Sequence, residues 1–227
     1  MQPYFFPYLG YFQLASHVDF FVIYDDVQYT KKGWLTRNKL NSPQGIWNLS
    51  LPTSASSVET LIREKKIAPE FNPDKLQRRI LNSYPNSQYK DEVRRLIEKT
   101  LGHSSRNLFT FLANSLSNTF DALKLDTSRL ITSSSLGNFT NLKAQDKLFA
   151  ICRSLGATTY VNPIGGRHLY DANLFLQNGI ELRLFTPFFE SQQEVPLSIL
   201  DTIFDRGLRE SEVLARLGSS NGSKVGK

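Results

Sequence analysis

The sequence predicts an α/β protein with a mostly parallel, Rossmann-like sheet flanked by helices and with a helical segment inserted in the middle of the chain. Residues 19–24 form a continuous β-branched and aromatic run, which is typical of a strand buried on both faces. Residues 141–185 alternate helix and strand patterns with a glycine before each strand, as in a βαβ crossover. Helical patterns alone fill residues 73–124.

The individual elements follow in order along the chain. Apolar spacing predicts a short helix at 8–18, and Pro3 and Pro7 prevent an earlier start. The strand at 19–24 comes next, and period-two alternation predicts another at 46–51, which stops at Pro52. The remaining pattern predicts helices at 73–83, 87–101 and 105–124, a strand at 129–132, a helix at 141–155, a strand at 158–161, a helix at 167–177 and a strand at 180–185.

The chain length favours one domain. We expect a single α/β domain over residues 1–217, with the helical insertion at about 70–125. The Ser, Gly and Lys residues of 218–227 indicate a flexible tail. Hydrophobic residues make up 40% of the chain and charged residues 21%, which is the balance of a folded protein and excludes a disordered one.

The net charge of +6 permits an anionic partner, whether a nucleotide, an acidic carrier protein or a membrane surface. Lys and Arg are dispersed among acidic residues, which favours a solvated face over a nucleic-acid surface, so we expect no nucleic-acid partner. No apolar stretch reaches the roughly 18 residues of a membrane span, and no signal peptide opens the chain. We therefore expect a cytoplasmic protein without a membrane span.

The cysteine and histidine content argues against a metal centre. Cys152 is the only cysteine and falls on an apolar helical stripe, which favours a packed thiol over a nucleophile. No metal-binding spacing links the three histidines. His17 ends the first helix, where a structural role is favoured, whereas His168 lies beside a double glycine and is a candidate acid or base.

Aromatic and polar side chains are concentrated in the first forty residues. Polar groups among aromatics need partners once water is excluded, so we interpret this segment as one wall of a ligand site. Core packing is the alternative for the aromatics, and a surface ion pair is the alternative for the arginine. The candidate substrate-binding residues here are Gln2, Pro3, Tyr4, Tyr8, Tyr11, Tyr29, Trp34, Arg37 and Asn38.

Two further groups of candidates follow predicted strands. Asp25 and Asp26 come after the strand at 19–24, and Asn162, Gly165 and Gly166 come after the strand at 158–161. Ligands bind at the carboxyl ends of strands in open α/β sheets, so we expect one crevice to hold both groups. Caps or turns are the structural alternatives. Adjacent residues of an extended chain point in opposite directions, so we expect at most one of the two aspartates, as acid or base, to face the ligand.

Together these segments resemble the WbqC-like protein family of bacteria. The resemblance rests on QPYFFPYLGYFQL at 2–14, FVIYDDVQY at 21–29, Gly33-Trp34 with Arg37-Asn38, YVN at 160–162 with Gly165-Gly166 and Leu169-Tyr170, and LSILD at 197–201. It adds Tyr170 to the candidate site. Family members carry a few more residues before the Gln-Pro, so a chain that begins at Met1 is expected to have a shortened first strand and an exposed sheet edge.

The resemblance implies a setting in O-antigen and other surface-glycan clusters, or in natural-product clusters. The function we expect from it is transferase activity that acylates or aminoacylates the amino group of a nucleotide-linked amino sugar. No cofactor is predicted, the acyl donor is not identified, and the basic chain would suit an acidic acyl-carrier protein. A noncatalytic sugar-nucleotide or glycan-binding factor and an ATP-using, nucleotidyltransferase-like ligase are the alternatives, although no phosphate-loop motif favours the latter.

Overall fold

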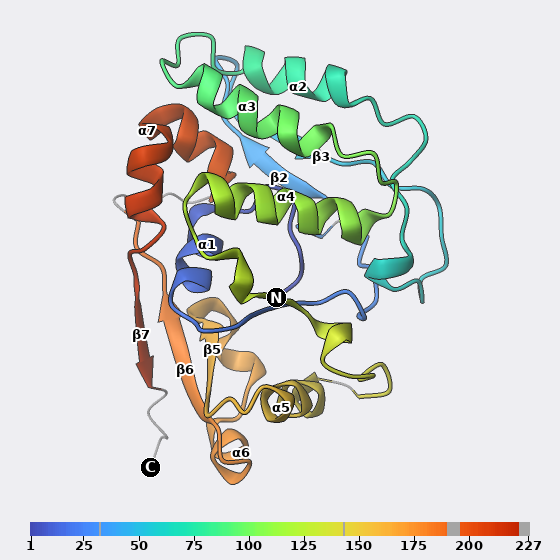
Figure 1. Ribbon diagram of the computed structural model, residues 1–227, viewed down its shortest axis with the longest axis vertical. Coiled ribbons are helices and arrows are strands. Elements are labelled where there is room, and N and C mark those ends of the chain that lie inside the picture. The colour runs from blue at the N-terminus through green and yellow to red at the C-terminus, as the bar shows by residue number, and fades with distance from the viewer. Residues whose placement is uncertain (32, 143, 190–195, 223–227) are drawn as a thin grey trace.

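The computed structural model describes residues 1–31, 33–142, 144–189 and 196–222, whose helices and strands are arranged as in Figure 1. The helices are α1 (Leu9–Ser16), α2 (Pro73–Asn82), α3 (Lys90–Leu101), α4 (Leu108–Ala122), α5 (Ala144–Ser154), α6 (Ala172–Gln177) and α7 (Ile199–Leu214). The strands are β1 (Phe21–Ile23), β2 (Arg37–Leu40), β3 (Trp47–Ser50), β4 (Leu130–Thr132), β5 (Thr159–Pro163), β6 (Glu181–Thr186) and β7 (Ser219–Gly222). Short 3₁₀ turns lie at Ile62–Glu64, Thr127–Arg129, Ser133–Ser135 and Ile164–Leu169.

The strands form separate small sheets. β1 pairs with β4 in parallel, β2 pairs with β3 as an antiparallel hairpin, and β5 pairs in parallel with β6, which is flanked by antiparallel β7. The α/β class is therefore consistent with the structure, whereas one continuous Rossmann-like sheet is not confirmed, because β1 and β5 are not hydrogen-bonded to each other. A cavity lies between them instead.

The three predicted central helices are present and two of them are capped as their sequences require. Asn72 accepts a hydrogen bond from Lys75 N, with a proline in the first helical position, and Asn107 accepts one from Thr110 N. The apolar faces of α2–α4 pack into the same core as the amino-terminal aromatics, which includes Phe5, Phe12, Ile80, Ile97, Leu112 and Phe120. A separate inserted helical unit is therefore not confirmed.

Two predicted elements differ from the structure. The helix expected at 167–177 is a 3₁₀ turn at Ile164–Leu169 followed by α6, because the Asp171 carboxylate accepts a hydrogen bond from Asn173 N and starts a new helix there. The expected flexible tail at 218–227 is ordered over Ser219–Gly222, where it pairs with β6; residues 223–227 lie outside the described part of the chain.

The amino-terminal segment is held by residues that are distant in sequence. Phe6 has a left-handed backbone, with φ of 43°, and its carbonyl accepts hydrogen bonds from Asn38 Nδ2 and, at 2.8 Å, from Ser198 Oγ. In α1 the buried Gln13 side chain donates to Leu214 O at 2.9 Å and accepts from Phe188 N at 3.0 Å. The first and last helices are thereby joined through buried polar groups.

Helix α7 is interrupted by one glycine. Gly207 has φ of +73°, a conformation that costs side-chain-bearing residues energy, and the Tyr89 ring lies where a Cβ would stand. Helix α7 continues beyond Gly207 to Leu214, and as a whole it packs against α1 and α3.

Candidate active site

Acidic and hydroxyl side chains meet at the carboxyl ends of β1 and β4. Asp25 and Asp26 follow β1, while Ser133 and Ser134 follow β4. Because the two strands are parallel neighbours, their ends lie at the same edge. Both aspartates are 3% exposed, so their polar atoms depend on protein partners.

The Asp25 carboxylate is fully engaged by the β4 turn. Its Oδ1 accepts hydrogen bonds from Ser133 Oγ and Ser134 N, both at 3.0 Å, and its Oδ2 accepts one from Ser134 Oγ at 2.7 Å. Its backbone N donates to Ser133 Oγ at 3.3 Å. Asp25 therefore fastens the end of β1 to the end of β4.

Asp26 forms a buried ion pair with Lys147 of α5. Lys147 Nζ lies 2.8 Å from Asp26 Oδ1 and also donates to Asp26 O at 3.0 Å. The two side chains are 7% and 1% exposed. The second carboxylate oxygen, Asp26 Oδ2, has no hydrogen-bond partner within the described residues. Asp26 is thus buried, ion-paired through Oδ1 and left with one free acceptor, Oδ2.

Ser133 joins the two aspartates. Its hydroxyl contacts Oδ1 of both Asp25 and Asp26, and because it carries one hydrogen it donates to one of them at a time. The expectation that adjacent aspartates point apart is wrong here. β1 ends at Ile23, so the extended alternation on which that expectation rests has stopped before the aspartates.

Lys147 was not among the sequence candidates, although the sequence carried a signal for it. The residue lies three or four positions from Ala144, Ala150 and Ile151, on the stripe of α5 that was expected to be apolar. A lysine on a buried helical stripe needs a buried counter-charge. Asp25 and Asp26 were the acidic residues among the candidates at a strand end.

Three tyrosines connect this cluster to β5. Lys147 Nζ lies 5.4 Å from the centroid of the Tyr24 ring. Burial, followed by the nearby Tyr170 and Asp26, raises the pKa of Tyr24. Burial also raises the pKa of Tyr160, whose hydroxyl lies 3.5 Å from that of Tyr170. The phenols of Tyr24 and Tyr160 therefore keep their protons and can donate hydrogen bonds at neutral pH.

The turn after β5 is packed closely. Asn162 is buried, accepts from Tyr160 OH at 3.4 Å and donates from Nδ2 to Pro163 O at 2.9 Å. A Cβ at Gly166 would collide with Asn162 Nδ2, whereas Gly165 has open space beside it. The ends of β1 and β5 are thus linked through Lys147 and the tyrosines.

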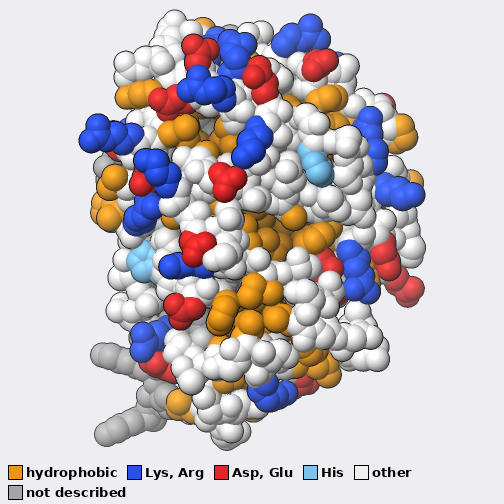
Figure 2. Space-filling view, viewed as in Figure 1, with side chains coloured by type: hydrophobic (Ala, Val, Ile, Leu, Met, Phe, Trp, Pro, Cys, Tyr) orange, Lys and Arg blue, Asp and Glu red, His pale blue; other side chains and the backbone are white. Residues whose placement is uncertain are grey.

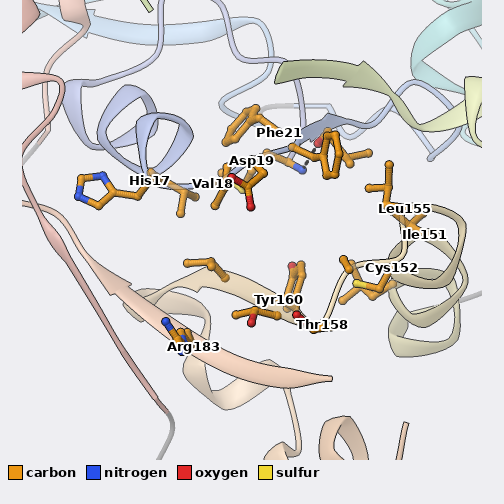
Figure 3. A pocket seen from close by; sticks show the side chains of 18 of the residues that line it. His17, Val18, Asp19, Phe21, Ile151, Cys152, Leu155, Thr158, Tyr160 and Arg183 are labelled. Atoms are coloured by element: carbon orange, nitrogen blue, oxygen red, sulfur yellow. Dashed lines mark hydrogen bonds between the residues drawn. The ribbon is translucent and has the colours of Figure 1, made fainter. Parts of the chain in front are cut away.

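A cavity of about 400 Å³ adjoins the cluster between β1 and β5 (Figure 3). Tyr24 and Tyr160 line it, as do Ile151 and Cys152 of α5 and Val18, which follows α1. Burial raises the pKa of the Cys152 thiol. The cysteine therefore lies in the packed, poorly ionised setting that its sequence position predicts.

Several amino-terminal candidates lie in the core or at other surfaces. Tyr11 is buried and donates from its hydroxyl to Gln2 O at 3.0 Å, and its ring packs against Tyr4. Pro3 is buried as well. Tyr8 stacks on Phe189 and lines a different, smaller pocket. Core packing, the alternative weighed for these aromatics, accounts for Tyr11.

The candidates between residues 29 and 38 surround the β2–β3 hairpin. Tyr29 lies beneath Lys65 Nζ, and its hydroxyl contacts Thr53 Oγ1 at 3.3 Å. Trp34 is 49% exposed and Arg37 is exposed, whereas the Asn38 amide is occupied by the Phe5 and Phe6 carbonyls. No contact joins these four residues to Asp25 or Asp26 in the described structure.

The histidines take separate places. His168 is exposed on the 3₁₀ turn after β5. His17 lines the cavity at the end of α1, and its Nδ1 lies 2.8 Å from Gln13 O. Within the described residues, no three His, Cys, Asp or Glu side chains are grouped closely enough to hold a metal ion.

The surface is mixed in charge. Figure 2 shows Lys and Arg interspersed with Asp and Glu over the viewed face, with apolar side chains near its centre. Exposed ion pairs among the described residues include Lys99–Asp121 and Arg206–Glu210. Among the described residues, no helix has the length and apolar character needed to cross a bilayer.

These features define an α/β protein with a buried acid–lysine–tyrosine cluster at the carboxyl ends of its parallel strands. The chain belongs to the WbqC-like protein family, whose model matches residues 2–213. It is also similar to the uncharacterized protein Rv1507c of Mycobacterium tuberculosis, with 26% identity over 220 residues that cover 92% of this chain and 93% of the relative. No solved structure matches the chain.

Proposed function

We propose that this protein is a group-transfer enzyme that acylates or aminoacylates the amino group of a nucleotide-linked amino sugar. The observation that carries the proposal is the buried Asp26 carboxylate, whose Oδ1 is ion-paired with Lys147 and whose Oδ2 has no partner among the described residues. A desolvated carboxylate with a free oxygen is a suitable acceptor for an amine proton. The proposed setting is surface-glycan biosynthesis of the O-antigen kind, or natural-product biosynthesis, in the cytoplasm.

In the proposed reaction the substrate nitrogen attacks the carbonyl carbon of the donor. A C–N bond forms, the bond from the carbonyl carbon to the donor's leaving group breaks, and Asp26 Oδ2 receives the proton released by the nitrogen. Lys147 and Ser133 hold Oδ1 and so orient the carboxylate. Because the Asp26 side chain is 1% exposed, the substrate has to displace neighbouring side chains to reach it.

Three tyrosines and the double-glycine turn surround this reaction centre in the proposal. Tyr24, Tyr160 and Tyr170 donate to sugar hydroxyls, and the Gly165-Gly166 turn offers backbone N–H groups to a carbonyl or phosphate oxygen. Asp25 positions Asp26 through Ser133. The net charge of +6 favours an acidic acyl-carrier protein as donor.

One observation favours a noncatalytic alternative. An aspartate locked to a buried lysine also serves as a structural tie between β1 and α5, as expected of a sugar-nucleotide-binding factor that performs no chemistry. Stoichiometric binding of a nucleotide sugar without any product would support this alternative.

The test is the mass of a nucleotide-linked amino sugar after incubation with the protein and a panel of acyl and aminoacyl donors. We expect a mass increase equal to the transferred group. Asp26→Asn should abolish turnover while retaining substrate binding, because it keeps the shape of the side chain and removes the proton acceptor. Asp121→Asn, on the surface of α4, is the matched control and should leave turnover unchanged. Equal turnover in the Asp26 variant and the wild type would exclude the carboxylate role.

A further inference from the structure

Lys65 is a buried lysine without a carboxylate partner. It follows the 3₁₀ turn at Ile62–Glu64 and is 2% exposed. Lysine is almost never fully buried unless it is paired. Within the described residues Lys65 forms no ion pair, and no carboxylate is among the groups that act on its pKa. The transfer reaction proposed above gives this side chain no role.

Neutral oxygens surround the Lys65 amine in place of a carboxylate. Its Nζ donates to Ser54 O and, at 2.6 Å, to Ser56 Oγ. It also lies 4.8 Å from the centroid of the Tyr29 ring. An ammonium group carries three N–H donors, so these two hydrogen bonds leave one donor for another acceptor. A carbonyl and a hydroxyl offset the cost of burying a full positive charge only in part.

A second lysine adds positive charge near Lys65. Burial lowers the pKa of the Lys65 amine, Tyr29 opposes this shift, and the positive Lys31 acts in the same direction as burial. Lys31 is exposed and has no ion pair in the part of the chain that the structure describes. Because the two lysines repel each other, an anion bound beside them would stabilise the charged form of both.

Hydroxyl groups supply further hydrogen-bond donors. The Tyr29 hydroxyl contacts Thr36 Oγ1 at 3.4 Å and Thr53 Oγ1 at 3.3 Å. Both contacts are longer than the usual O–H···O distance of about 2.7–2.8 Å, so these hydroxyls can turn toward a ligand at little cost. Two point charges and several hydroxyls suit the tetrahedral oxygens of a phosphoryl group, whereas a flat carboxylate is better matched by the fork of an arginine.

The backbone joins this cluster to the candidate active site. Arg63 N donates to Asp25 O at 2.9 Å. Tyr29 N donates to Thr60 O at 2.9 Å, so the segment that begins with the two aspartates lies alongside the segment that leads to Lys65. Tyr29 comes three positions after Asp26, which is at most roughly 11 Å of extended chain. That span is of the order of the length of a sugar with its diphosphate.

We propose that Lys65 and Lys31, together with the Tyr29 hydroxyl, form a binding site for a diphosphate group. This inference deepens the proposed function and rests on it for the natural ligand, which is the diphosphate of the nucleotide-linked amino sugar whose amine reaches Asp26. Because Lys65 is 2% exposed, residues 54–56 have to move aside to admit the anion.

The test is isothermal titration calorimetry of the full chain with inorganic pyrophosphate. We expect saturable binding to the wild type, and binding roughly tenfold or more weaker in Lys65→Met, which keeps an unbranched side chain and removes the charge. Lys66→Met is the matched control, because Lys66 is the exposed neighbour of Lys65, and it should bind as the wild type does. Equal affinities of the two variants would overturn the proposal.

Urea unfolding without pyrophosphate distinguishes a ligand site from a structural tie. Lys65→Met removes a buried charge that has no counter-charge, so its unfolding midpoint should be no lower than that of the wild type. Loss of binding at an unchanged or higher midpoint supports the site. A lower midpoint would show that Lys65 is retained to hold residues 54–56, against the proposal.

The wild-type protein locates the anion without any substitution. Amide chemical shifts of Tyr29, Ser54 and Ser56 should change as pyrophosphate is added. The absence of saturable binding, or shifts confined to other segments, would also overturn the proposal. Uridine diphosphate should compete with pyrophosphate, and failure to compete would exclude a nucleotide as the source of the diphosphate.

These measurements use no acyl donor. Failure of pyrophosphate to bind would therefore leave the proposed role of Asp26 standing. Failure of the transfer assay, with pyrophosphate still bound at Lys65, would count against the transferase alone.

Discussion

Removal of the Lys147 charge tests the buried ion pair that organises the candidate site. In Lys147→Met the Asp26 carboxylate remains buried and loses the ammonium that lies 2.8 Å from Oδ1. The hydrogen bond from Lys147 Nζ to the backbone carbonyl of Asp26 is lost as well. Breaking a buried pair by removing one partner costs about 3–5 kcal/mol. That is a large part of the roughly 5–15 kcal/mol by which a domain of ordinary stability is folded.

The assay is urea unfolding of a double-mutant cycle. Asp26→Asn together with Lys147→Met replaces both charges, so we expect the double variant to be more stable than Lys147→Met by about 2 kcal/mol or more. Lys99→Met removes an ion pair whose side chains are 58% and 50% exposed, and it should cost less than about 1 kcal/mol. Lys147→Met could cost no more stability than this control, or the stability losses of Asp26→Asn and Lys147→Met could simply add in the double variant. Either result would show that the Asp26–Lys147 pair does not contribute the energy that we assign to it.

Further predictions concern a buried acid, a glycine and the cysteine. Burial raises the pKa of the Asp201 carboxyl above 3.8, its value in the unfolded chain. The protonated carboxyl therefore contributes stability that is fully present below pH 3.8 and is lost as the pH rises through the higher pKa of the folded protein. Asp201→Asn keeps an acceptor for the Tyr84 hydroxyl and should flatten this part of the profile of melting temperature against pH; an unchanged profile would refute the assignment. Gly207→Ala should destabilise the protein by about 2–4 kcal/mol in urea unfolding, because the new Cβ collides with the Tyr89 ring at a position whose φ is already unfavourable. Gly156→Ala is the control, because Gly156 has φ of +62° with open space beside it, and it should cost about 1 kcal/mol. Equal costs for the two variants would contradict the collision. Alkylation of Cys152 should be roughly a hundredfold slower in the native protein than in urea, as followed by mass spectrometry, and rapid native labelling would show that the thiol is accessible.

Hydrophobic periodicity located most of the elements, and tertiary pairing created those it missed. The patterns predicted α1, α2, α3 and α4 to within a few residues. β2 was missed because Arg37-Asn38-Lys39-Leu40 lacks strand propensity and is a strand only through its register with β3. Ser219–Gly222 has the composition of a tail and is ordered by the edge of β6.

The site shows the same division between local and long-range information. The position of Asp25 and Asp26 at a strand end followed from the apolar run before them. Their meeting through Ser133 did not, because it depends on the turn after Ile23 and on β4, more than a hundred residues away. Lys147 was visible in principle as a charge on an apolar stripe, and only the position of α5 identified its partner.

The buried hydrogen bonds between the two ends of the chain bear on folding during synthesis. They join Gln13 to Phe188 and Leu214, and Phe6 to Ser198. The ribosome releases the aromatic opening of the chain first and the segment that covers it last. At about 5–20 residues per second, close to 200 residues of synthesis leave those rings without their native cover for roughly 10–40 s. Nascent chains are therefore most exposed to aggregation or chaperone capture until the final helix emerges.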